Sequence, residues 1–290
     1  MTNSMIDRCF IIFILSPCIR SSKSVLIHLK MKKYNYHTHT YRCKHAFGTD
    51  EEYVLAAIEA GYEILGFSDH APYRDYPSRT SHMDWEQLDD YLQSILLLKE
   101  RFKDRIEIHL GLESEYYDYC RSERMELRNR VEYLLLGQHF SDPAGNEVSY
   151  FRQNTDEEIL DYAKSVCKAL DTGMYTYLCH PDVFLNRQTE FTETCEKVAH
   201  MIARKAAETD TPMEINIRGS IRGKMPFRNG ERFFYPNRDF WEIASQYPIR
   251  CVIGVDAHHP KDLLEAWEHV DACLDELKDL DLHFIEEPLM

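Results

Sequence analysis

From about residue 31 onward, short apolar runs alternate with amphipathic stretches along the chain. The apolar runs have the length of buried strands, and the stretches between them place apolar side chains at helical spacing, as at Trp85, Leu88, Leu92, Ile95 and Phe102. Strands are expected at 33–39, 63–70, 106–113, 131–139, 174–180, 212–218 and 249–258. Helices are expected at 50–61, 83–102, 156–171, 190–209, 237–246 and 260–280, with Asp50 as the N-cap of the first.

This alternation of strands and helices predicts an α/β protein in which parallel strands predominate. Residues 31–290 contain no internal repeat, low-complexity linker or change of composition, so a single domain is expected. Seven strand–helix units favour a closed barrel, and the unequal lengths of their connections predict an irregular one.

The first 30 residues differ from the rest of the chain. Their apolar run, "CFIIFILSPCI", is too short to span a membrane and is interrupted by Pro17. Asp7 stands beside Arg8 in the segment before it, which disfavours a secretory signal. We therefore expect residues 1–30 to be an extension outside the fold, with Met31 as the natural first residue.

Composition and charge narrow the function classes. With 44% hydrophobic and 29% charged residues, the 290-residue chain has the composition of a globular protein. Its net charge of −15 argues against a broad basic surface for nucleic acid, but a few arginines or metal ions would still admit an anionic substrate. The nine dispersed cysteines form no CxxC pair, which favours reduced thiols, a cytoplasmic location and no membrane association.

Polar side chains recur where the expected strands end. In βα barrels the loops after the strands build the active site, so these side chains should converge at one mouth. Residues two apart on a strand face the same way, which pairs His37 with His39 and Asp256 with His258. The full set is His37, His39, His45, Asp69, His70, Glu113, His139, His180, Arg218, Asp256 and His258.

Imidazoles and carboxylates that converge in this way are typical metal ligands. The set is too large for one ion, so two or three divalent ions are expected, and zinc, iron and manganese all suit these donors. Cys43 and Cys179 lie close in sequence to the candidates but are expected to be small buried hydrophobes. His82 is expected in a polar loop.

The motifs "HTHT", "KH", "GFSDH", "GLESEY", "LGQH", "CHPD" and "GVDAH" resemble those of the polymerase and histidinol phosphatase (PHP) family over essentially all of 31–290. The resemblance implies a distorted (β/α)₇ barrel that holds three metal ions. By this resemblance, one ion is bound by His37, His39, Glu113 and Asp256, and a second by Glu113, His139 and His180. The third is bound by His45, His70 and His258.

Within that family, "EINIR" and the freestanding length most resemble histidinol-phosphate phosphatases of histidine biosynthesis. The resemblance implies hydrolysis of L-histidinol phosphate to L-histidinol and phosphate by a metal-bridging hydroxide. Arg218, with Arg187 or Arg222, is expected to bind the phosphate. An arginine usually follows the strand-five histidine closely in such phosphatases, whereas here Asn186 precedes Arg187.

Two further roles are left open by the sequence. Asp69 is a candidate proton donor to the leaving group, although strand parity points it away from His70 and favours a structural role. Glu115, Tyr117 and Tyr73 are candidates for a pocket wall facing the substrate's amine and imidazole.

Three alternatives remain. One is a phosphoesterase of the same family that acts on a nucleotide, an oligonucleotide end or a phosphotyrosyl peptide. Another is an amidohydrolase-type barrel, which also opens with HxH and ends with a strand-end aspartate but leaves three ligand positions unexplained. The last is a non-catalytic, metal-stabilised module. Nothing in the sequence sets the oligomeric state.

Overall fold

The computed structural model describes residues 32–76, 80–142, 149–152, 155–228, 230–286 and 288–289. The expected extension and the expected start at Met31 lie outside these residues, so they stay predictions. Within the described part of the chain, no helix combines the length and the apolar character needed to cross a membrane.

Eight parallel strands form one curled sheet in the order β1-β2-β3-β4-β5-β6-β9-β10. Just after the ends of β1 and β9, a parallel bridge between Thr38 and Ala257 joins these two strands. It closes the first seven strands of the sheet into a ring. There the N–H of His39 donates to the carbonyl of Ala257 over 2.9 Å. The strands are β1 Tyr34–Asn35, β2 Ile64–Phe67, β3 Glu107–Ser114, β4 Tyr133–Leu136, β5 Tyr177–Leu178, β6 Met213–Asn216, β9 Arg250–Gly254 and β10 His283–Phe284. The distorted (β/α)₇ barrel is thus confirmed.

The strand β10 was not anticipated. It pairs with the start of β9, at Arg250 and Cys251, which is the end of the barrel opposite the polar strand ends. The hydroxyl of Tyr34 donates to the carbonyl of Ile285 over 2.9 Å and accepts from the N–H of Ile253 over 3.1 Å. One buried phenol therefore ties β1, β9 and the C-terminal segment together at the base.

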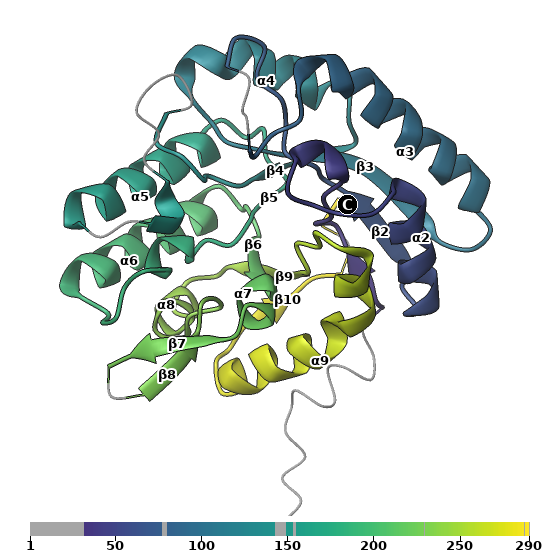
Figure 1. Ribbon diagram of the computed structural model, residues 1–290. Coiled ribbons are helices and arrows are strands. Elements are labelled where there is room, and N and C mark those ends of the chain that lie inside the picture. Colours follow the sequence, from purple (N-terminus) through teal and green to yellow (C-terminus); the bar gives the residue numbers. More distant parts are fainter. Residues whose placement is uncertain are drawn as a thin grey trace, which may run out of the picture.

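Helices surround the strands as an outer ring (Figure 1). They are α2 Asp50–Glu59, α3 Leu88–Phe102, α4 Arg121–Arg128, α5 Asp156–Leu170, α6 Glu193–Glu208, α7 Arg218–Ile221, α8 Arg238–Ala244 and α9 Pro260–Leu277. The expected cap of α2 was wrong by one residue. Thr49 is the N-cap, because its hydroxyl accepts from the N–H of Glu52 while Glu52 binds the N–H of Thr49 in return. Asp50 instead pairs with the buried Arg42.

Several elements go beyond the expected pattern. The helices α4 and α7 were not predicted, nor was the antiparallel hairpin of β7 Lys224–Phe227 and β8 Gly230–Phe233, which lies outside the ring of helices in Figure 1. The observed strands are mostly shorter than expected: β5 has two residues where seven were predicted. The residues that follow them leave the sheet at the mouth, where their side chains gather.

Candidate metal centre

The predicted ligands lie together at the mouth of the barrel. Glu113, at the end of β3, is the centre of the group, and its carboxylate lies 3.0–3.5 Å from a ring nitrogen of each of five histidines. The rings of His39 and His258 have centroids 4.1 Å apart, and His45 lies beside His258 at 4.8 Å. The structure therefore brings together His37, His39, His45, His70, Glu113, His139, His180, Asp256 and His258.

Four donor atoms face one another without hydrogen bonds. His37 Nε2 and His39 Nε2 lie 3.4 and 3.5 Å from Glu113 Oε2, and 3.6 and 3.1 Å from Asp256 Oδ1. All four atoms are buried and have no hydrogen-bond partner among the described residues. Ligand bonds of about 2.0–2.2 Å place the donors of a tetrahedral ion about 3.3–3.6 Å apart. The spacing therefore fits one divalent cation.

Two more groups adjoin this cradle. Glu113 Oε1 lies 3.0 Å from His180 Nε2 and 3.3 Å from His139 Nε2, and these two nitrogens are 3.2 Å apart. On the other side, donor atoms of His45, His70 and His258 lie within 4.8 Å of one another. The residues of the three ligand sets that the family resemblance implies thus lie in three adjoining groups, with Glu113 in the first two, and their assignment as metal ligands stays a prediction.

Two residues of the site have strained backbone conformations. His180 and Asp256, each just beyond a strand, have φ angles of 29° and 54°, in the left-handed region that few non-glycine residues adopt. Such strain is typical of functional sites, where the surroundings hold the residue in place. At Gly137 a Cβ atom would overlap the Glu113 carboxylate, so a glycine is required for that side chain to reach the cradle.

Glu214 is a functional candidate that sequence reasoning missed. It lies on β6, is fully buried, and its Oε1 is 2.8 Å from His37 Nδ1. Its Oε2 accepts from the N–H of His180 over 3.1 Å. Glu214 therefore fixes the ring of His37, so that Nε2 faces the cradle. The available signal was a lone acidic residue inside an apolar strand, which is costly to bury without partners.

Asp69 lies behind His39. Its Oδ1 is 3.5 Å from His39 Nδ1 and accepts from the N–H of His70, while its Oδ2 accepts from the hydroxyl of Thr40. Complete burial raises the pKa of Asp69 to about 7, against the lowering effect of these hydrogen bonds. The buried Arg42 donates to the same hydroxyl of Thr40 over 3.2 Å. Asp69 does not line the cavity, which favours the structural role over the proton donor.

His82 lies in a loop, as expected, whereas Glu115 does not line the cavity. His82 is buried, lines the cavity, and places Nε2 3.1 Å from both oxygens of Glu115. Glu115 also lies 2.9 Å from His139 Nδ1 and accepts from the hydroxyl of Tyr73. Burial raises the pKa of Glu115, but His82 and His139 outweigh it and hold that pKa well below its usual range. Glu115 is thus occupied in orienting His139 and is not a free wall for a substrate amine.

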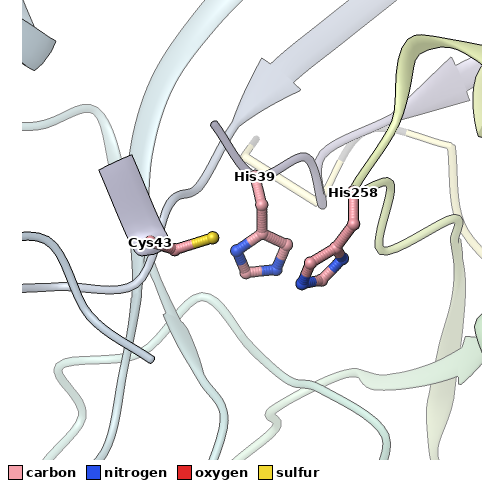
Figure 2. Close-up of side chains that lie close together, drawn as sticks. All are labelled: His39, Cys43 and His258. Atoms are coloured by element: carbon pink, nitrogen blue, oxygen red, sulfur yellow. The ribbon is translucent and has the colours of Figure 1, made fainter. Parts of the chain in front are cut away.

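Cys43 lies next to the metal-ligand candidate His39. Figure 2 shows its sulfur pointing toward the ring of His39, with His258 on the other side of that ring. Burial raises the pKa of the Cys43 thiol far above its usual value, which opposes formation of a thiolate. This geometry agrees with the expectation that Cys43 is a buried hydrophobe. The seven cysteines among the described residues are all free thiols.

A cavity of about 200 Å³ opens onto the metal-ligand candidates. Arg218 and Arg222 line it, whereas Arg187 is exposed and is not among its lining residues. The 3₁₀ turn Val183–Leu185 follows His180, and Arg187 lies beyond it at the surface. Neither Tyr73 nor Tyr117 lines the cavity. The aromatic side chains that do are Phe140, Phe151 and Tyr235.

A parallel-stranded barrel with these strand-end histidines and carboxylates is the architecture of a metal-dependent hydrolase. The family model "PHP domain" matches residues 35–218, and the chain belongs to the PHP family. A protein of Deinococcus radiodurans named "Probable histidinol-phosphatase" is 26% identical over 234 residues, which cover 78% of this chain and 86% of that protein. The histidinol-phosphatase of Bacillus subtilis is 28% identical over 157 residues, covering 51% and 58% of the two chains.

Among solved structures, the histidinol phosphate phosphatase of Lactococcus lactis superposes with a TM-score of 0.68 at 20% sequence identity. The match covers 88% of this chain and 96% of the other. That structure contains zinc, L-histidinol and phosphate. At this level of identity the likeness establishes the shared fold.

Proposed function

We propose that this protein is a metal-dependent phosphoric monoester hydrolase that converts L-histidinol phosphate to L-histidinol and phosphate. The observation that carries the proposal is the cradle of four buried, unpaired donor atoms from His37, His39, Glu113 and Asp256, next to a cavity lined by two arginines. Relatives named histidinol-phosphatase, and a fold neighbour that contains histidinol and phosphate, support this substrate.

We propose three divalent ions in the three donor clusters. When bound, such ions lower the pKa of a coordinated water and neutralise charge on phosphoryl oxygens. The chain contributes the geometry: Glu214 holds His37 and Glu115 holds His139, each through a hydrogen bond to Nδ1. These two carboxylates fix which ring nitrogen faces the centre, so that His37 and His139 need little rearrangement on loading.

Arg218 and Arg222 supply the phosphate site in this proposal. Both line the cavity beside the donor clusters, and a guanidinium binds phosphate oxygens with two parallel N–H bonds. Arg222 also lies over the ring of Phe234, with its Cζ 5.2 Å from the ring centroid, which limits the positions of its side chain. Arg187 has no part in the proposed site, because it lies at the surface outside the cavity.

The cavity favours a small substrate. Its volume of about 200 Å³ is below the range of about 300–1,000 Å³ typical of drug-sized ligands. A compact phosphate ester fits such a space, whereas an oligonucleotide or a peptide would extend out of it. Phe151, stacked on His139 with 3° between the ring planes, gives the cavity a flat aromatic wall suited to an imidazole. A cytoplasmic location, consistent with the free thiols, is part of the proposal.

The test is a comparison of substrates with metal-replete protein. Turnover of histidinol phosphate, an aryl phosphate, a nucleotide and an oligonucleotide with a terminal phosphate should be measured side by side. We expect a clear preference for histidinol phosphate. A preference for the nucleotide or the oligonucleotide would overturn the substrate but keep the site, and no hydrolysis of any phosphoester would overturn the enzymatic function.

A further inference from the structure

Arg218 and Asp262 form an ion pair at the rim of the cavity. Arg218 is the first residue of α7, and Asp262 lies in the first turn of α9. Arg218 Nη1 lies 3.2 Å from Asp262 Oδ2 and donates to the carbonyl of Asp256 over 3.2 Å. Within the described part of the chain, both side-chain hydrogen bonds of Arg218 start at Nη1. Its Nη2 and Nε therefore remain for another acceptor.

The same oxygen of Asp262 holds the turn that carries two predicted metal ligands. It accepts from the N–H of His258 over 2.8 Å and from the N–H of His259 over 3.0 Å. The second bond is half of the capping box of α9, whose N-terminus also favours a negative charge. One carboxylate oxygen thus joins the guanidinium of Arg218 to the backbone between Asp256 and the start of α9.

We propose that Asp262 is a positioning residue for phosphate binding, which rests on the proposed function of the cavity. Arg218 lies at the rim, where 26% of its side chain is exposed, and an unpaired arginine there would have many rotamers available. By binding Nη1, Asp262 holds the Arg218 side chain in one conformation before the phosphate arrives. The Nη2 and Nε edge of the guanidinium then remains to bind the phosphate. The charge of Asp262 alone would repel a phosphate dianion, so its benefit depends on Arg218.

This dependence gives a test by double-mutant cycle. The wild-type full-length chain, Arg218→Ala, Asp262→Ala and the double variant are loaded with metal. The KM, the kcat and the affinity for inorganic phosphate, measured by calorimetry, are then compared. We expect Asp262→Ala to raise the KM and to weaken phosphate binding by about 3- to 30-fold. In the Arg218→Ala background, Asp262→Ala should leave the KM and the phosphate affinity unchanged, or should lower the KM and strengthen phosphate binding. The reason is that only the repulsive charge of Asp262 is then removed.

Two variants separate positioning from helix capping. Asp262→Asn keeps an oxygen for the N–H groups of His258 and His259 but loses the charge, so it should retain the metal content and still weaken phosphate binding. Glu158→Ala removes the equivalent capping carboxylate of α5, which binds the N–H of Thr155 over 3.1 Å. It should leave the KM and phosphate binding unchanged.

An equal loss of phosphate affinity in both backgrounds would overturn the proposal, as would a loss that follows the metal content. Either result would mean that Asp262 acts through the metal turn or the helix. Phosphate binding needs no turnover, so the cycle is informative even for an inactive protein. Absence of hydrolysis by the wild-type protein would instead contradict the proposed function.

Discussion

His39 Nε2 lies 3.1 Å from Asp256 Oδ1, and neither atom has a hydrogen-bond partner among the described residues. His39 follows β1 and Asp256 follows β9, on either side of the Thr38–Ala257 bridge that closes the barrel. The bridge that closes the barrel therefore also brings together two of the four donors of the cradle. An ion in the cradle would replace the hydrogen bonds that these buried atoms lack.

Removal of metal should therefore lower the thermal stability of the barrel. At a free metal concentration about a thousand times the Kd, one site stabilises the folded state by about 4 kcal/mol. For a chain of this length we expect chelation to lower the Tm by roughly 5–10 °C. Differential scanning calorimetry with and without a chelator measures this. A Tm that is unchanged after complete metal removal would contradict the link between closure and loading.

His37→Ala and Asp256→Ala should each abolish activity. Each removes one of the four donor atoms of the cradle, so both metal content and rate should fall together, the rate by more than about 100-fold. His200→Ala is the matched control, because His200 lies on α6 and its contact is with the hydroxyl of Tyr247. Elemental analysis measures the metal content, and a phosphate-release assay measures the rate. Full metal and full rate in either ligand variant would refute the ligand assignment.

Glu214→Gln tests the residue that the motifs did not reveal. The amide keeps the size of the side chain but weakens its hold on His37 Nδ1, so we expect metal affinity to fall by about 10- to 100-fold. A competition titration with a chromophoric chelator gives the affinity. Glu132→Gln, at the exposed pair with His109, is the control. An unchanged affinity in Glu214→Gln would show that His37 is oriented by other contacts.

Metal loading should release protons near neutral pH. Burial opposes the charging of His139, but Glu113 and Glu115 outweigh it and raise its pKa to about 10 in the metal-free protein. A group with a raised pKa is protonated below that pKa, and a metal ligand must be neutral, so the proton has to leave. Metal affinity should therefore increase as the pH rises from acid toward alkaline. Calorimetry in buffers of different ionisation enthalpy measures the release, and an identical enthalpy in all of them would exclude it.

The fold and the convergence of the strand-end side chains followed from the sequence for a physical reason. Residues two apart on a strand share a face, and the ends of parallel strands meet at one mouth, so "HTH" and "DAH" predict pairs of neighbouring side chains. The structure agrees: the rings of His37 and His39 have centroids 5.1 Å apart, and His258 Nδ1 lies 3.3 Å from Asp256 Oδ1.

The remaining features depend on contacts between distant segments. His82 lies in a loop, but its burial there depends on Glu115, which follows β3. The exposure of Arg187 depends on the turn at Val183–Leu185. Glu214 lies in a strand whose sequence, "MEIN", gives no sign of its partner His37. Local spacing fixes which face a side chain takes, but not which neighbour it meets.

The most direct test of the central claim is phosphate release from L-histidinol phosphate by the full-length protein, first freed of metal and then reloaded stepwise with zinc, manganese or iron. We predict no turnover without metal, and a rate that rises with the ions bound and reaches its maximum when the three donor clusters are filled. Equal turnover by the metal-free and the fully loaded protein would contradict the account, and so would a loaded protein that leaves histidinol phosphate intact.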